Sequence, residues 1–202
     1  MTLIFAYQGK DFAVVSTDLL HRRVPASAYR EKGRAKVIQE WDFETYFGEK
    51  FRRSKVGNHW IVMAGWADGY LTKRVYSTPL EEIEKGVASA FHLEEAQSDL
   101  AFLIYKPGKG LRFCGGKNAK HHNLSALPTY STLIIGNTEE YSAIKNQLRS
   151  KNKSPEEVAL EVHRAVKMMV DMQIPLNEGH ALRGVSTYLA NHTVKRIANS
   201  RT

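Results

Sequence analysis

The chain is poor in cysteine and has no long apolar run. Its 202 residues include a single cysteine, Cys114, which cannot form a disulfide within the chain and is typical of a reducing compartment. No apolar stretch approaches the length of a transmembrane helix, and the first residues lack the basic segment and apolar core of a secretion signal. We therefore expect a cytoplasmic protein with no membrane partner.

Motifs for cofactor and metal binding are absent as well. The glycine-rich segment 110–117 has Leu111 and Asn118 where a phosphate-binding loop needs a glycine and a Ser or Thr. His121 and His122 are adjacent, so their side chains diverge, and no zinc motif accompanies them. A polar loop explains this pair better than a metal site. We expect neither a metal nor a cofactor.

The composition fits one globular domain over residues 1–202. The length is enough for one substantial core and short for two, and 43% of the residues are hydrophobic. Lys and Arg outnumber Asp and Glu by 29 to 21, which gives a formal net charge of +8. A moderately basic surface more often serves solubility than the binding of an acidic polymer. We expect no nucleic-acid partner.

Two β-rich apolar runs at the start of the chain predict a hairpin. Residues 3–7 and 12–17 flank the polar residues 8–11, a pattern typical of two strands and a tight turn. Folding the pair about the centre of this turn sets Ile4 opposite Val15. Because residues 3–7 and 12–15 are continuously apolar, we expect both faces of this hairpin to be buried.

The predicted register also brings polar residues together at the open end of the hairpin. Thr2 lies opposite Thr17, roughly 5 Å away between Cβ atoms, and one step from Asp18. A hydroxyl residue at the end of a buried strand, faced by a carboxylate, is the layout of an N-terminal nucleophile hydrolase. An aspartate also ends many hairpins for turn reasons alone, so these residues by themselves leave both interpretations open.

The order of the predicted elements indicates the fold class. Strands, helices, strands, helices and strands follow one another in blocks, which is not the alternating order of a parallel α/β protein. This order predicts an α+β fold, a four-layer αββα sandwich of two antiparallel sheets between helical layers. We expect strands at 3–7, 12–17, 34–40, 59–64, 100–105, 111–114, 131–135, 182–190 and 193–197, and helices within 68–96, divided at Pro79, and at 139–149 and 155–172.

Two stretches of the first half allow both a structural and a functional interpretation. Residues 41–58 carry four cations, Lys50, Arg52, Arg53 and Lys55, and predict a protruding loop or hairpin that is either solvated or in contact with a partner. Gly65 ends the apolar strand 59–64. It is either a packing glycine or one that leaves room for an oxyanion beside its N–H.

With these positions in place, the chain resembles a proteasome β-type subunit, in the branch of N-terminal nucleophile hydrolases that includes bacterial proteasome-like proteases. The resemblance covers essentially the whole domain. It is most specific in the opening hairpin, in Lys36-Val37-Ile38 and in Met63-Ala64-Gly65. The family has a threonine, an aspartate, a lysine and a glycine in this order, and the matching positions are Thr2, Asp18, Lys36 and Gly65.

The resemblance implies a mechanism. Removal of Met1 would free the Thr2 amine, and the reference pKa of an α-amino group, roughly 8, suits a general base. Lys36 would favour ionisation of the Thr2 hydroxyl, Asp18 would hold Lys36 charged, and the Gly65 N–H would stabilise the oxyanion. Met63 and Ala67 would line the substrate pocket. Supporting polar residues of the family are replaced or not recognisable, and their candidates here are Asn137, Thr138, Asn177 and Glu178.

We therefore expect a threonine peptidase that acts on peptide bonds through an acyl-enzyme on Thr2. A proteasome-related peptide ligase uses the same intermediate, and a non-catalytic β-type assembly or binding subunit is the alternative without chemistry. The resemblance further implies peptide or protein substrates, self-association into a ring, and an activator or unfoldase as a partner.

Overall fold

The structure is a computed structural model that describes residues 3–23, 44–65, 67, 69–93, 100–115, 123–136, 153–173 and 184–200. The predicted strand 34–40 and helix 139–149 lie outside these residues. The elements are β1 (Ile4–Gln8), β2 (Ala13–Asp18), β3 (Leu20–Arg23), β4 (Glu44–Phe47), β5 (Arg52–Arg53), β6 (Trp60–Ala64), α3 (Gly69–Val75), α4 (Leu80–Lys85), α5 (Val87–Phe91), β7 (Ala101–Lys106), β8 (Gly110–Cys114), β9 (Ser125–Ala126), β10 (Ser131–Ile135), α7 (Pro155–Gln173), β11 (Val185–Ala190) and β12 (Val194–Ser200).

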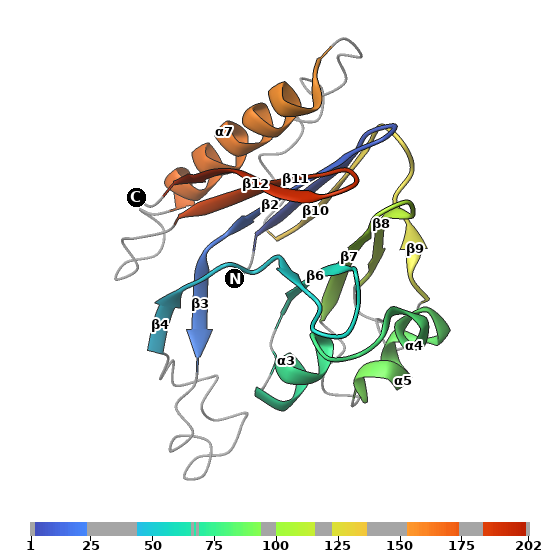
Figure 1. Ribbon diagram of the computed structural model, residues 1–202. Helices are drawn as coiled ribbons and strands as arrows, with labels where there is room; N and C mark the ends of the chain where they lie inside the picture. The colour runs from blue at the N-terminus through green and yellow to red at the C-terminus, as the bar shows by residue number, and fades with distance from the viewer. Residues whose placement is uncertain are drawn as a thin grey trace.

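The strands form two antiparallel sheets of five strands and a separate two-stranded ribbon. The first sheet has the order β10-β1-β2-β11-β12, the second has the order β5-β6-β7-β8-β9, and β3 pairs with β4. In Figure 1, α7 lies along the outer side of the first sheet, and α3, α4 and α5 lie beside the second. This arrangement confirms the predicted α+β sandwich. No helix in the described part of the chain is long and apolar enough to cross a membrane.

The apolar runs are continuous because each sheet is covered on both faces. In β1, Phe5 and Tyr7 pack against α7, whereas Ile4 and Ala6 face the second sheet and pack with its Val62. This alternation is the two-residue period of a strand. The other face of the second sheet packs against the three short helices in a cluster that includes Ile61, Leu71, Ile83, Phe91, Phe102 and Ile104.

The register of the first hairpin differs from the prediction by two residues. Ile4 pairs with Thr17 rather than with Val15, because the turn extends to residue 12 and the Gly9 N–H donates to the Phe12 carbonyl at 2.8 Å. A Cβ on Gly9 would lie 2.4 Å from the Phe12 ring, so this close turn requires glycine. A shift of two residues keeps every side chain on its predicted face.

The prediction of a protruding loop or hairpin at residues 41–58 holds only in part for the residues that the structure describes, since residues 52–53 and 55–58 are exposed whereas residues 50–51 are buried. β4 pairs with β3, and β5 pairs with β6. Both Lys50 and Phe51 are buried. The helical region after residue 68 also differs, since Gly86 separates α4 from α5 where one helix was expected.

Candidate active site

Asp18 stands at the end of β2 and joins three segments of backbone. Its Oδ1 accepts the Leu3 N–H at 2.7 Å, and its Oδ2 accepts the Leu20 N–H at 3.2 Å. The Asp18 N–H in turn donates to the Leu3 carbonyl at 3.2 Å. The residue is only 4% exposed. The carboxylate is therefore fixed at the start of β1, beside the amide that follows Thr2 in the chain.

Lys50 forms a buried ion pair with Asp18. The Lys50 Nζ lies 2.9 Å from both carboxylate oxygens, and the Lys50 and Asp18 side chains are only 4% and 5% exposed. Burial of a lysine at this depth is costly unless an opposite charge and hydrogen bonds compensate it. The geometry thus holds an ammonium group at the end of β2. The same Asp18 carboxylate binds both this ammonium group and the Leu3 N–H.

The backbone around Lys50 is held by its aromatic neighbours. The Tyr76 hydroxyl donates to the Lys50 carbonyl at 3.1 Å. The next residue, Phe51, is fully buried, with its ring 5.5 Å from that of Trp60 and 5.4 Å from that of Tyr188. Because Trp60 and Tyr188 belong to different sheets, Phe51 packs between the two sheets and anchors the backbone of the neighbouring Lys50.

The family resemblance gave the role of this lysine to Lys36. Lys36 lies outside the described residues, and the structure places Lys50 against Asp18. One feature of the sequence does favour Lys50. It precedes the hairpin of β5 and β6, and the second strand of this hairpin leads to Gly65. Its position within a cation-rich segment indicated a solvated loop instead.

The second strand of that hairpin carries Met63 and leads to Gly65. β5 pairs Arg52 with Ile61, and continuing this antiparallel register by two residues leads from Arg52 to Lys50 and from Ile61 to Met63. Gly65 is exposed and has a φ of 105°, in the region that favours glycine.

Met63 and Ala67 are half-buried and pack against the cluster beneath the short helices. The part of each side chain that stays accessible is compatible with the predicted pocket. Thr2, Asn137, Thr138, Asn177 and Glu178 lie outside the described residues, so their predicted roles stay predictions.

A histidine that the sequence did not single out lies beside the ion pair. The His21 Nε2 is 3.0 Å from the Gly48 carbonyl. Burial, with the nearby charges of Lys50 and Arg52, lowers the pKa of His21 to about 4. The imidazole is therefore neutral near pH 7, and the positive charge around it belongs to the lysine and the arginine.

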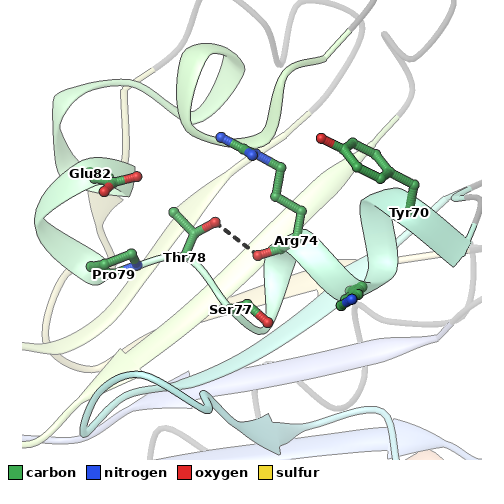
Figure 2. Close-up of a pocket in the computed structure, with 7 residues that line it drawn as sticks. Tyr70, Arg74, Ser77, Thr78, Pro79 and Glu82 are labelled. Atoms are coloured by element: carbon green, nitrogen blue, oxygen red, sulfur yellow. Dashed lines mark hydrogen bonds between the residues drawn. The ribbon is translucent and has the colours of Figure 1, made fainter.

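A hollow of about 340 Å³ lies elsewhere, between α3 and α4. Figure 2 shows its lining and the hydrogen bond from the Thr78 hydroxyl to the Arg74 carbonyl. None of its lining residues contacts Asp18 in the described structure, so this hollow is separate from the ion pair. Among all residues that the structure describes, no three His, Cys, Asp or Glu side chains gather as a metal site requires.

Two stacked antiparallel sheets lie between helices and begin with a buried hairpin that ends in Asp18, and this proteasome-like fold is shared with solved structures. Two solved structures are similar to this chain throughout. The Gly-1 mutant of Anbu from Hyphomicrobium sp. strain MC1 has a TM-score of 0.59 and 10% identity, over 100% of this chain and 87% of that one. Eukaryotic HslV from Trypanosoma brucei has a TM-score of 0.53 and 14% identity, over 94% of this chain and 99% of that one.

Comparison at the level of sequence gives no match, either to a protein-family model or to a curated protein. The likeness to Anbu and HslV therefore establishes the fold of the chain, and the chemistry must be argued from its own residues.

Proposed function

We propose that this chain is a threonine-nucleophile amidohydrolase that cleaves peptide bonds through an acyl-enzyme on Thr2, once Met1 is removed. The observation that carries the proposal is the buried pair of Lys50 and Asp18 at the Leu3 amide. An ammonium group fixed at the start of β1 is what a hydroxyl nucleophile at that place would need. A buried ion pair is weak evidence for stability in itself, so a purely structural role explains the pair less well than a catalytic one.

The roles follow from the charges. Asp18 uses both oxygens to hold the Lys50 ammonium, which keeps the lysine charged and oriented. The lysine would stabilise the Thr2 oxygen as it loses its proton to the Thr2 amine, directly or through water. In this proposal Lys50 takes the role first given to Lys36. The exposed Gly65 backbone is the proposed oxyanion donor.

The bond changes balance without any cofactor. The Thr2 oxygen attacks the peptide carbonyl carbon, the carbon–nitrogen bond breaks, and the leaving amine takes the proton that the Thr2 amine had accepted. Water then attacks the ester and regenerates the hydroxyl. If another amine replaces water in the last step, the same site acts as a peptide ligase, so product analysis with an added amine separates the two outcomes.

Turnover of a fluorogenic peptide panel by two lysine variants tests the proposal. Lys50→Met should lower kcat/KM by at least about 10², as loss of electrostatic stabilisation does at other sites, whereas Lys36→Met should retain turnover. Because Lys50→Met also removes a buried pair, the Asp18→Asn/Lys50→Met double variant serves as a folded control that should be equally inactive. Full activity of folded Lys50→Met would overturn the assignment of this role to Lys50. An equal loss of activity in Lys36→Met would return the role to Lys36.

Self-association into a ring and a cytoplasmic location are further parts of the proposal. Both rest on the family resemblance, as do an activator or unfoldase as partner and support of the Thr2 amine by Asn137, Thr138, Asn177 or Glu178. Sedimentation equilibrium tests the first part. A species that stays at the 22.9 kDa of one chain at high concentration would contradict self-association.

A further inference from the structure

Three residues converge next to the ion pair, and the middle one has no side chain. A Cβ built on Gly48 would lie 3.5 Å from the Arg52 Nη2 and 3.6 Å from the Cδ2 and Nε2 of His21. The guanidinium and the imidazole therefore flank the space above Gly48. The charges of Lys50 and Arg52 both act on His21.

Arg52 is held in place by two of its neighbours. Its Nε donates to the Glu49 carbonyl at 2.5 Å, and its guanidinium carbon lies 5.9 Å from the centre of the Tyr76 ring. Among the residues that the structure describes, no carboxylate pairs with it. Glu49 pairs with Arg196 instead.

The Asp18 carboxylate is also engaged, since it pairs with Lys50. Arg52 is exposed, so its outer nitrogens can be reached from solvent. The result is a pre-oriented guanidinium that no acid of the described residues neutralises, two residues along the chain from the proposed catalytic lysine.

We propose that Arg52, over Gly48 and beside His21, forms a subsite that binds an acidic side chain of the peptide substrate. The inference deepens the proposed function and rests on it, because Arg52 is two residues along the chain from the proposed catalytic Lys50. A guanidinium binds a carboxylate through two parallel hydrogen bonds. The neutral imidazole gives this subsite a wall without adding charge, and the absence of a side chain on Gly48 leaves the Arg52 Nη2 uncovered on that side.

The test uses peptides that differ only in charge. Two fluorogenic peptides with Glu or Gln before the scissile bond are compared by kcat/KM on the parent, on Arg52→Gln and on Arg53→Gln. Arg53 is the control because it is the next residue of the same exposed strand, so its side chain points to the opposite face.

The parent should favour the Glu peptide by at least about tenfold, the typical effect of a charge-assisted hydrogen bond. Arg52→Gln should abolish this preference, and Arg53→Gln should keep it. A parent that cleaves both peptides equally, or an Arg52→Gln variant that still prefers Glu, overturns the subsite while the proposed function stands.

A binding measurement separates the two proposals when neither peptide is cleaved. Calorimetric titration of the two cleavage products, acetylated peptides that end in Glu or Gln, reports the subsite without turnover. Tighter binding of the Glu product that is lost in Arg52→Gln and kept in Arg53→Gln supports the subsite even though the proposed peptidase function has failed. Equal binding of both products overturns the subsite.

Discussion

Breaking the pair of Asp18 and Lys50 should destabilise the protein far more than breaking an exposed pair. Asp18→Asn leaves the Lys50 ammonium, at 4% exposure, without its counter-charge. Removal of one partner from a buried pair typically costs about 3–5 kcal/mol in the free energy of unfolding. Lys50→Met should cost less, because the Asp18 carboxylate still accepts hydrogen bonds from the N–H groups of Leu3 and Leu20.

The double variant Asp18→Asn/Lys50→Met should cost clearly less than the sum of the two single changes. No charge is left buried in it, and the two new side chains have similar volumes to the old ones. We expect a coupling energy of about 2 kcal/mol or more between the two positions, within the range for contacting groups. Urea unfolding at pH 7 measures all three variants by linear extrapolation.

The pair of Lys167 and Asp171 on α7 is the matched control. Its atoms are 2.5 Å apart, but the two side chains are 37% and 39% exposed, so its coupling should be about 0.5 kcal/mol or less. In 1 M salt the control coupling should vanish, whereas that of Asp18 and Lys50 should persist because burial limits screening. Additive single changes at Asp18 and Lys50 would refute the reasoning.

Two further predictions concern pH and helix capping. The pKa of His21 is lowered to about 4 in the folded protein, so the unfolded chain binds a proton more tightly and stability should fall as the pH drops from about 6.5 to 4. His21→Gln should make that fall shallower in urea unfolding across this range, and an unchanged slope would contradict the assignment. Ser154 and Glu157 cap α7 reciprocally, with the Ser154 N–H donating to Glu157 at 2.7 Å and the Glu157 N–H donating to Ser154 at 3.2 Å. Ser154→Ala should cost about 1 kcal/mol in the same assay, and a loss no larger than that of the exposed Ser125→Ala would count against the cap.

The fold could be predicted from the sequence because its signal is local. Residues 3–7 and 12–15 are apolar at every position, which a strand shows only when both faces are covered, and α7 begins at Pro155 as its capping pattern indicates. The register of the hairpin could not be predicted, because it depends on how the Phe12 ring and carbonyl close over Gly9. Nothing in the residue types of 8–11 specifies that closure.

The lysine of the proposed site could not be predicted from the sequence, for a different physical reason. Asp18 and Gly65 follow strands that the sequence indicates, so their places are set by local pattern. The choice between Lys36 and Lys50 depends on a contact across 32 positions of the chain, and a lysine that is buried by its partner looks in sequence like any lysine in a cationic loop. Only the pairing in three dimensions tells the two apart.

The most direct test of the account is to map the adduct of a peptide epoxyketone, which captures a hydroxyl and an amine on the same residue. The account predicts that mass spectrometry finds Met1 removed and a single adduct on Thr2, with partial labelling of Thr2→Ser and none of Thr2→Ala. An adduct on Cys114 or on a surface lysine, with Thr2→Ala as reactive as the parent, would contradict it.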